Sequence, residues 1–505
     1  MRKYLVVLTF FLFSLNLVHA SSKVLVKFRH GSALAAAHTF NKVQAQGVST
    51  FRIIPQLYEL KFNNEKEALK AINYFKKNSE IAYAELDHKV FLINKLGDEF
   101  PFPWPGNPDN GDGEFPFPWP WDPGDGDGEF PFPWPWDPGD GDDPFPWPFP
   151  DPNPTPVEDP ELILNPEPIV TPAPDADLSK SWGIGKIKAP EAWEISKGSR
   201  DVVVAVIDTG IDYNHEDLAL NVWRNPGESG EYKDEKTGET KRRETDKVDN
   251  DNNGFIDDVV GWDFANNDAL PFDDHNHGTH VSGTIGAVGQ NGKGTAGVNQ
   301  EVSIMGLKFL SAGGSGDVSA AIKAIEYAAQ NGARVMSNSW GDYENSTALE
   351  DVIKAIKEKN ILFVAAAGND SLDNDADRKL YPASYTLENI ISVASSTDDD
   401  SRSFFSHWGK TSVDIAAPGS HVYSSVAGGK YEYFDGTSMA TPHVAGAAAL
   451  LLSIDKNLGY KELADALLEN VDKIDSWKEK IVTGGRLNIF NAAKKISERK
   501  GLIKN

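Results

Sequence analysis

Apolar strand-like runs alternate with helix-like segments through the second half of the sequence. The runs with a strand pattern are 202–207, 302–309, 334–338, 361–366 and 389–394. The segments with helical spacing are 318–330, 349–359, 438–453 and 460–470. This alternation predicts an α/β fold with a mostly parallel sheet and helices on both faces. Ligands of such sheets bind beyond the carboxyl ends of the strands.

Polar side chains occur where such a ligand would bind. Asp208 and Asn369 each come at the end of a predicted strand, and His277 and Ser438 each open a helical segment of small residues. A helix N-terminus suits Ser438, because its free N–H groups and the positive end of the helix dipole stabilise negative charge. An acid, a histidine, an amide and a serine at one sheet edge supply every role of acyl transfer.

The segment that Ser438 opens contains a proline near its start. We expect Pro442 to lie in the first turn of this helix. A proline in the first turn costs nothing, because the N–H that it lacks would have no partner within the helix.

Three short blocks around these residues resemble a known family. They are Val206-Ile207-Asp208-Thr209-Gly210, His277-Gly278-Thr279-His280-Val281-Ser282-Gly283 and Gly436-Thr437-Ser438-Met439-Ala440-Thr441-Pro442-His443. They are similar to the signature blocks of the subtilisin-like serine proteases and stand in that family's order. The resemblance covers about residues 178–495. It implies a serine endopeptidase of broad specificity that acts on polypeptide substrates through an acyl-enzyme.

The resemblance also implies a role for each site residue. Ser438 would be the nucleophile, His277 the general base and acid, and Asp208 the group that orients the imidazole. Asn369 would stabilise the oxyanion. The segment Ser339-Trp340-Gly341 resembles the one that pairs with extended substrate, and Gly368 beside Asn369 completes the predicted substrate-binding set.

Two alternatives compete with this interpretation. His275, His277 and His280 could hold zinc, but the sequence lacks the His-Glu-x-x-His arrangement of metalloproteases. His280 and His443 are expected to be structural. The other alternative is a non-catalytic binding or adhesion protein that keeps an inactive protease fold. An intact set of catalytic residues argues against it.

An acidic loop predicts a structural calcium site. Oxygen-bearing side chains alternate around Gly254, although Val260 stands where a bidentate glutamate belongs in a calcium loop. The predicted ligands are Asp249, Asp251, Asn253, Asp257 and Asp258. A solvated acidic loop is the alternative. The resemblance implies a second site at Asp217 with the loop around Asn291. With no cysteine to form disulfides, extracellular stability must come from packing or bound ions.

The N-terminal part predicts export and processing. Residues 1–20 have the basic start, apolar run and small final residue of a secretory signal, and the apolar run is shorter than the ~20 residues of a spanning helix. We therefore expect a secreted, extracellular protein. Residues 21–96 predict a small α+β unit that resembles the family's inhibitor-like propeptide. The resemblance implies that this unit is an intramolecular inhibitor. We expect self-cleavage near Asn94 to Gly97, which would leave the Pro/Trp repeats that follow on the mature enzyme; the alternative is their removal in a second cut.

A Pro- and Trp-rich linker, 97–177, separates this unit from the predicted catalytic domain, 178–497, and its tail, 498–505. From Asp98 to Asp177 the sequence has 24 of the 31 prolines and carries 20 of the 26 net negative charges. Such a chain favours extended polyproline II structure or disorder. It is either a stiff acidic spacer or a segment that docks its Pro-Trp repeats on a surface or polymer. Nucleic acid is excluded as a partner, because phosphate binding needs clustered positive charge.

Overall fold

The computed structural model describes residues 22–30, 33–93 and 160–502, except residues 167, 170 and 235. The predicted signal segment 1–20, the cleavage region 94–97, the repeats up to residue 159 and residues 503–505 lie outside the described residues. The described residues before 94 and after 159 belong to one compact unit. We call residues 22–93 the N-terminal unit and residues 160–502 the main domain.

The main domain is built on a nine-stranded sheet with the order β19-β20-β16-β15-β14-β12-β6-β10-β9. Every neighbouring pair is parallel except the antiparallel pair β19 and β20. The mostly parallel α/β fold predicted from the sequence is therefore confirmed. The strands are β6 (Gly198–Asp208), β9 (Gly261–Asp263), β10 (Glu301–Lys308), β12 (Val335–Asn338), β14 (Leu362–Ala366), β15 (Ile390–Ser396), β16 (Ile415–Pro418), β19 (Asp472–Lys473) and β20 (Gly485–Arg486).

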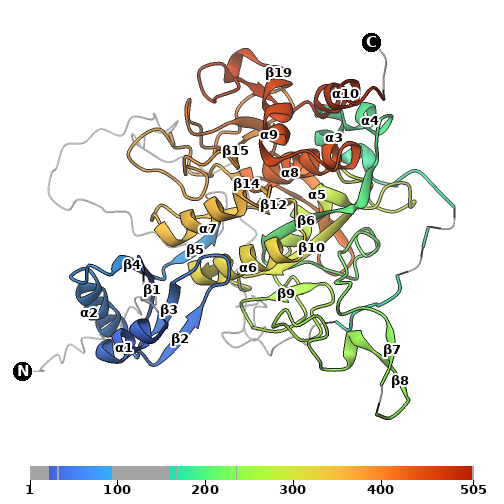
Figure 1. Ribbon diagram of the computed structural model, residues 1–505. Helices are drawn as coiled ribbons and strands as arrows, with labels where there is room; N and C mark the ends of the chain where they lie inside the picture. The colour runs from blue at the N-terminus through green and yellow to red at the C-terminus, as the bar shows by residue number, and fades with distance from the viewer. Residues whose placement is uncertain are drawn as a thin grey trace, which may run out of the picture. The chain divides into compact units, whose positions relative to one another are not determined.

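Helices cover both faces of this sheet (Figure 1). Alternate side chains of β6 enter two different cores: Val204 and Val206 pack in one, and Ala205 and Ile207 in the other. A strand buried on both faces must be apolar throughout, which explains its continuous apolar run. One face carries α5 (His277–Gly286), α8 (Thr437–Ile454), α9 (Tyr460–Glu469) and α10 (Ile489–Arg499); the other carries α6 (Val318–Gln330) and α7 (Thr347–Lys357).

Short elements complete the main domain. The helices α3 (Trp182–Lys186) and α4 (Ala189–Trp193) precede β6, and 3-10 turns occur at Leu178–Lys180, Arg243–Thr245 and Asp475–Trp477. Two hairpins are formed by β7 (Glu231–Lys233) with β8 (Thr240–Arg242) and by β17 (Val422–Val426) with β18 (Lys430–Phe434).

Helix α8 is the central helix of the main domain. By length and composition it is the one described helix that is apolar enough to cross a membrane, but 94% of it is buried inside the protein. It packs against β6, β12, β14, β15 and β16. Its apolar character is therefore that of a core helix that carries Ser438 near its start.

The predicted position of Pro442 is wrong. Helix α8 begins at Thr437, so Pro442 is its sixth residue and lies beyond the first turn. A proline there leaves the carbonyl four residues earlier without its helical partner, and that carbonyl belongs to Ser438. The Ser339 hydroxyl donates to this carbonyl oxygen at 3.0 Å. The helix thus tolerates Pro442 because Ser339 replaces the missing donor.

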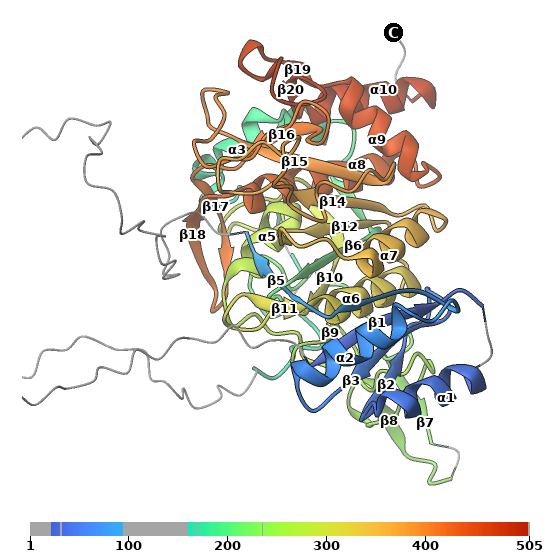
Figure 2. The same cartoon turned by 90° about the vertical axis from the view of Figure 1, so that its left-hand side faces the viewer.

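The N-terminal unit forms a four-stranded antiparallel sheet with the order β2-β3-β1-β4 and two helices. Its elements are β1 (Lys23–Phe28), α1 (Ala33–Val43), β2 (Gly47–Thr50), β3 (Leu57–Lys61), α2 (Glu65–Phe75), β4 (Ile81–Leu86) and β5 (Lys89–Leu92). The last strand, β5, does not join this sheet. It lies between β11 (Ser315–Asp317) and β13 (Trp340–Gly341) of the main domain. Figure 2 shows β5 apart from the sheet of its own unit and near β11.

Carboxylates of the N-terminal unit cap two helices of the main domain. Glu85 accepts hydrogen bonds from the Thr347 and Ala348 N–H groups, at 3.0 and 3.1 Å, at the start of α7. Asp87 accepts from the Ser319 N–H at 2.8 Å at the start of α6. Free N–H groups and the helix dipole favour a carboxylate at such positions. These contacts orient the unit so that β5 lies between β11 and β13.

Residues 160–177, assigned from the sequence to the extended linker, lie against the rest of the main domain. The Pro160 carbonyl accepts from the Tyr213 hydroxyl at 2.7 Å, and Ala173 forms a parallel bridge with Asn291. This part of the linker has main-chain groups that can pair, so it is held along the surface.

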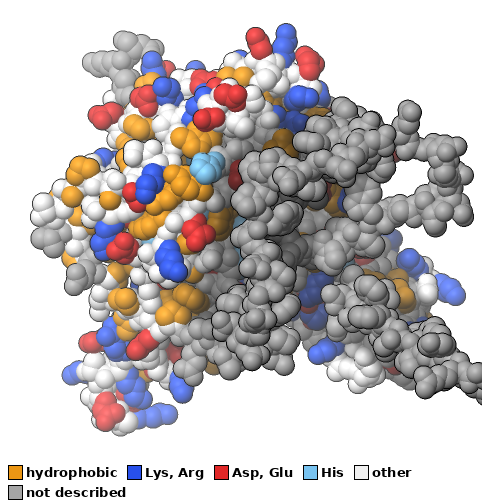
Figure 3. All heavy atoms as spheres, turned by 180° about the vertical axis from the view of Figure 1, so that it is seen from behind, with side chains coloured by type: hydrophobic (Ala, Val, Ile, Leu, Met, Phe, Trp, Pro, Cys, Tyr) orange, Lys and Arg blue, Asp and Glu red, His pale blue; other side chains and the backbone are white. Residues whose placement is uncertain are grey.

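On the face shown in Figure 3, basic side chains are interspersed with acidic ones and do not gather into one patch.

Candidate active site

Asp208 and His277 meet at the carboxyl end of β6. The His277 Nδ1–H donates to Asp208 Oδ1 at 2.8 Å, and both residues are buried. Asp208 Oδ1 also accepts from the Thr209 N–H at 2.7 Å. An imidazole that donates from Nδ1 in its neutral form keeps Nε2 free to accept a proton.

Buried polar contacts hold α5 and its first residue, His277, against the end of β6. Thr209 Oγ1 accepts from the Gly278 N–H at 2.9 Å and donates to Asp273 at 2.8 Å. Asp273 also accepts from the Thr279 N–H at 2.7 Å, which satisfies a free donor at the start of α5. A Cβ at Gly278 would lie 2.1 Å from the Gly210 carbonyl oxygen, so this close approach requires glycine. Asp273 was not predicted, although an acid shortly before a helix is a capping signal.

The surroundings of His277 favour its protonated form. Burial disfavours the charge, but the negative charge and hydrogen bond of Asp208, with a contribution from Asp273, outweigh it and raise the pKa of His277. Its Nε2 is buried and has no hydrogen-bond partner among the described residues. The imidazole is therefore a base with one free position.

Ser438 lies in the first turn of α8 with its hydroxyl turned toward two carbonyl groups. Its Oγ donates to Ile93 O, with the two oxygens 3.2 Å apart, and to Ser339 O at 3.3 Å. Among the described residues it makes no hydrogen bond to His277, so the structure brings the serine and the histidine to one site without closing that contact. Catalytic hydrogen bonds are commonly long in resting enzymes.

The side-chain amide of Asn369 points at the same carbonyl group. Its Nδ2 donates to Ile93 O at 2.6 Å. The amide cannot be flipped, because its Oδ1 accepts from both the N–H and the hydroxyl of Thr437, each at 2.9 Å. The Thr437 hydroxyl in turn accepts from the Gly368 N–H at 3.2 Å. Thr437 thus holds the amide in place, a role that no pattern in the sequence predicted, and Gly368 acts through it.

The groove beside Ser438 pairs with extended main chain on both sides. Strand β5 is antiparallel to both neighbours: Phe91 is opposite Ser315 on one side and Gly341 on the other. The Leu92 N–H donates to the Gly314 carbonyl at 2.8 Å. Of the predicted substrate-binding residues, Trp340 and Gly341 form one edge of the groove, while Ser339 contacts Ser438.

The second edge of the groove, β11, was not predicted. A signal for it is present in the glycine-rich stretch 313–316. A Cβ at Gly316 would lie 2.4 Å from the Phe309 carbonyl oxygen, and Gly314 has a φ of +70°. Close backbone packing of this kind requires glycine.

An apolar pocket receives the last described residue of the N-terminal unit. The Ile93 side chain is 8% exposed and packs with Ala366, Leu380 and the partly buried Tyr343. The carbonyl of the same residue accepts hydrogen bonds from the Asn369 amide and the Ser438 hydroxyl. The pocket wall suits an aliphatic side chain.

The other histidines of the signature blocks are buried in structural positions. His280 stacks on Phe434 with ring centroids 4.4 Å apart, and its Nε2 lies 2.9 Å from the Val422 carbonyl oxygen. Burial, with the neighbouring His277 adding to it, lowers the pKa of His280 to about 3. His443 Nδ1 lies 2.9 Å from the Met439 carbonyl oxygen, and burial lowers its pKa to about 4.

Two of the predicted calcium ligands converge with a residue that was not predicted. Oxygens of Asp249, Asp251 and Glu228 all lie within 4.8 Å of one another. Glu228 is completely buried, and its burial, with the charge of Asp251 adding to it, raises its pKa. Three carboxylates at one point repel one another unless a cation neutralises them. No motif marks Glu228, which lies twenty-one residues before Asp249 in the sequence.

The remaining predicted ligands have other partners. Asn253 donates to Asp251 at 3.2 Å and to Asp258 at 2.8 Å, and Asp258 also accepts from Asn225 at 2.9 Å. Asp257 accepts from the Lys247 N–H at 3.1 Å.

Asp217 lies apart from this acidic loop. It accepts from the Asn291 side chain at 2.6 Å and from the Thr295 N–H at 2.9 Å. Burial raises the pKa of Asp217 to about 6, so this carboxylate is costly to keep charged where it lies.

Comparison with known proteins shows which sequences this chain is similar to. Residues 199–490 match the model of the subtilase family. The chain is 36% identical over 318 residues to thermitase from Thermoactinomyces vulgaris, covering 62% of this chain and 96% of thermitase. It is 38% identical over 301 residues to a thermophilic serine proteinase from Bacillus sp. (strain AK1), covering 60% of this chain and 64% of that protein. Subtilisin-like protease 1 of Plasmodium berghei is 34% identical over 346 residues, covering 64% of this chain and 55% of that protein.

Proposed function

The chain belongs to the subtilase family of serine endopeptidases, and from this premise we propose that it cleaves polypeptides with Ser438, His277, Asp208 and Asn369 as its catalytic residues. The observation that carries the proposal is the Ile93 carbonyl group, which lies within hydrogen-bonding distance of both the Ser438 hydroxyl and the Asn369 amide. A substrate carbonyl held there has a nucleophile and an oxyanion donor on it at once.

The proposed reaction follows from these positions. Ser438 turns its hydroxyl from the two carbonyl acceptors to the free Nε2 of His277, which takes the proton as Oγ attacks the carbonyl carbon. Asn369 stabilises the negative oxygen that forms, and Asp208 stabilises the imidazolium. His277 then gives its proton to the leaving amine, which leaves an acyl-enzyme. Water then attacks the acyl carbon while His277 takes its proton, and His277 returns a proton to Ser438 as the carboxylic acid product leaves.

We propose that the enzyme has broad specificity, with a preference only for the residue that precedes the cleaved bond. The two edges β11 and β13 pair with main-chain groups, which every peptide has. The pocket of Ala366, Leu380 and Tyr343 adds a preference for an aliphatic side chain at the position of Ile93.

We propose that the N-terminal unit is a propeptide that inhibits the enzyme and is cut after Ile93. Strand β5 fills both edges of the groove, so no substrate can pair while it is in place. The proposed bond joins Ile93 to Asn94, at the start of the region predicted from the sequence. Secretion, guided by residues 1–20, and retention of the repeats on the mature enzyme are part of the same proposal. N-terminal sequencing should find Asn94; a mature chain that starts only near Leu178 would rule out retention.

We further propose that Glu228, Asp249 and Asp251 hold a structural calcium ion. Calcium binds six to eight oxygens at about 2.3–2.6 Å, so two of its ligand oxygens lie up to about 5 Å apart, which agrees with the separations in this cluster. The ion would neutralise the buried Glu228 and cross-link two loops.

Casein hydrolysis by the full chain tests the proposed activity. We expect wild type to lose activity on treatment with a serine-reactive sulfonyl fluoride, and Ser438→Ala to have none and to stay uncut. Ser476→Ala, which changes an exposed serine, is the matched control and should keep full activity. Equal hydrolysis by wild type and Ser438→Ala would refute the proposal. The alternative of an inactive adhesion protein has no support from the site geometry.

A further inference from the structure

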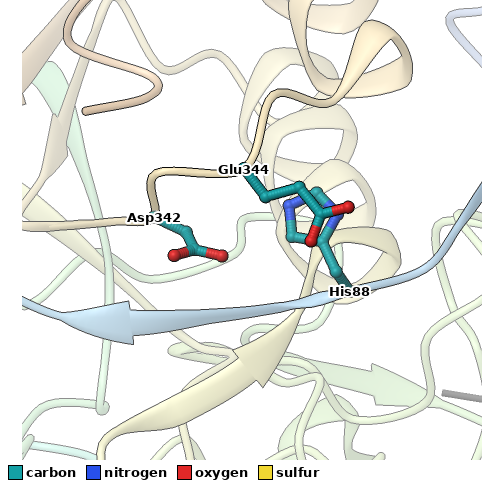
Figure 4. A group of neighbouring side chains, drawn as sticks. All are labelled: His88, Asp342 and Glu344. Carbon is teal, nitrogen blue, oxygen red and sulfur yellow. The ribbon is translucent and has the colours of Figure 1, made fainter. Parts of the chain in front are cut away.

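Three metal-ligating side chains meet where the N-terminal unit contacts the main domain: His88, Asp342 and Glu344 (Figure 4). One ligand atom from each lies within 4.8 Å of the other two. We propose that this group binds a first-row divalent transition-metal ion such as Zn²⁺, and that the ion links the N-terminal unit to the main domain.

The backbone on the N-terminal side is fixed. His88 is the residue before β5, and its carbonyl accepts from the Val318 N–H at 3.1 Å. One residue before it, Asp87 caps α6. The imidazole is therefore presented at a defined place, and it makes no hydrogen bond to any described residue.

The backbone on the other side is fixed as well. Asp342 follows β13, and its N–H and carbonyl pair with those of Tyr381 at 2.9 and 2.8 Å. Asp342 Oδ1 accepts from the Tyr343 N–H at 2.7 Å, which sets the carboxylate plane. Glu344, two residues on, is exposed, so its longer side chain can adjust. The site thus has two ligands whose backbone is held and one adaptable ligand that faces solvent.

The two carboxylates of this group are not paired with a lysine or arginine in the part of the chain that the structure describes. Within 22–30, 33–93 and 160–502, neither Asp342 nor Glu344 has a lysine or arginine within ion-pair distance. Burial of Asp342 adds to the cost of the uncompensated charge. A bound divalent ion would supply the missing positive charge.

The donor set selects the class of metal. Imidazole nitrogen with two carboxylates suits zinc, cobalt, nickel or copper, whereas calcium and magnesium prefer oxygen alone. The cluster of Glu228, Asp249 and Asp251 in the same chain differs because it offers only oxygen ligands. Zinc binds histidine nitrogen and carboxylate oxygen at about 2.0–2.2 Å. Around a zinc ion the three ligand atoms would therefore lie closer together than the 4.8 Å within which they now lie. A rotation of the exposed Glu344 side chain can close the site around the ion, with water as the fourth ligand.

The position of the site gives the ion a role. His88 precedes the proposed cut after Ile93 by five residues and belongs to the segment that must leave the groove. Its two partners follow the groove edge β13 and stay with the enzyme. A metal bond across this boundary would hold the cut N-terminal unit in place, so release would become slower as the metal concentration rises.

Metal binding is tested on full-length Ser438→Ala, with calcium present to fill all-oxygen sites. Calorimetric titration with Zn²⁺ should show a site that His88→Asn and Glu344→Gln each weaken by at least tenfold. His38→Asn, an exposed histidine of the same unit, is the matched control and should bind as the parent does. Melting temperatures without metal should be equal for the parent and the three variants, which shows that a loss of binding is not a loss of folding. Co²⁺ in place of Zn²⁺ should give a visible absorption band that the same two variants lose.

The proposal is overturned if the parent binds no Zn²⁺ beyond the calcium-filled sites, or if His88→Asn and Glu344→Gln bind it as tightly as the parent. The first result would leave His88, Asp342 and Glu344 as neighbouring side chains that bind no metal. Because this measurement uses a chain without the serine nucleophile, it does not depend on the proposed protease activity, and either proposal can fail alone.

Release kinetics test the role and rest on the proposed function. In the wild-type chain after self-cleavage, Zn²⁺ should slow separation of the N-terminal unit several-fold, measured by size-exclusion chromatography. His88→Asn should show no slowing. Equal slowing in both chains would refute the linking role. As a control, Zn²⁺ is added to enzyme that has already lost the N-terminal unit, and any change in its hydrolysis rate reports a separate effect of the ion on His277.

Discussion

The side-chain amide of Asn369 donates to the carbonyl oxygen of Ile93 at 2.6 Å, and Ser438 Oγ lies 3.2 Å from the same oxygen. This relationship joins a residue before the linker to two residues far along the chain. On the proposed function the end of the N-terminal unit takes the position of a substrate, and the expected effects of changing Asn369 and Thr437 depend on this contact.

Replacement of Asn369 by alanine should reduce kcat for peptide hydrolysis by about 10²–10³-fold with little change in KM, a magnitude taken from the equivalent donor of subtilisin. The amide is aimed at the carbonyl oxygen, whose charge grows in the transition state. Steady-state kinetics on a short peptide with an aliphatic residue before the cut bond measure both constants. A rise in KM at unchanged kcat would assign Asn369 to ground-state binding.

Loss of the Thr437 hydroxyl should lower kcat by a smaller factor than loss of Asn369. Thr437 orients the amide through two hydrogen bonds to its oxygen, of which the N–H bond remains in Thr437→Val. Thr437→Ser keeps the hydroxyl and should retain most activity. Equal kcat values in the valine and serine variants would show that the hydroxyl has no positioning role.

Activity should fall as the pH decreases through the pKa of His277. The protonated imidazole cannot accept the Ser438 proton, and the Asp208 carboxylate raises this pKa above the ordinary value of about 6.5. Asp208→Asn removes that charge and leaves burial, so the acidic limb of kcat/KM should move to lower pH while kcat falls by about 10⁴-fold. The measurement is the profile of kcat/KM from about pH 5 to about pH 9. A wild-type limb below the ordinary value would contradict the expected effect of Asp208.

The N-terminal unit should bind more weakly as the pH rises through about 6. Burial, with the nearby charge of Asp317 adding to it, raises the pKa of Asp87 to about 6, so the bound state favours the protonated acid. On release Asp87 regains its ordinary pKa near 3.9. The contribution to affinity is therefore full below that value and is lost between it and about pH 6. The dissociation rate of the cut unit, followed by size-exclusion chromatography, should rise over this window, and Asp87→Asn should flatten the rise.

Removal of calcium should reduce stability and leave the chemistry intact. A chelator should lower the melting temperature of wild type, and Glu228→Gln or Asp249→Asn should lower it without a chelator and make the protein insensitive to one. Glu239→Gln, at an exposed position in the hairpin of β7 and β8, is the control and should behave as wild type. Immediate loss of hydrolysis at low temperature on chelation would point instead to a catalytic metal.

The sequence predicted the sheet and the residues at its edge because these depend on local patterns. The run Val202 to Ile207 is apolar throughout, since it is buried on both faces, and Asp208 follows at the point where the strand ends. The same logic located His277, Asn369 and Ser438.

Features that depend on distant segments were not predictable. Glu228 reaches the acidic loop from another loop with no motif to mark it, and β5 pairs with strands more than two hundred residues away. Pro442 was misplaced because its tolerance comes from the Ser339 hydroxyl, a contact between residues about a hundred positions apart. Spacing alone does not encode such contacts.

The groove edges are short: β11 has three residues and β13 has two. A peptide can enter between them only as a fully extended strand with its main-chain groups unpaired on both sides, a state that helices and sheets of folded proteins do not offer. The enzyme would therefore cleave unfolded chains and leave folded proteins, including other copies of itself, intact. Folding state would decide whether a protein is a substrate before its side-chain sequence does.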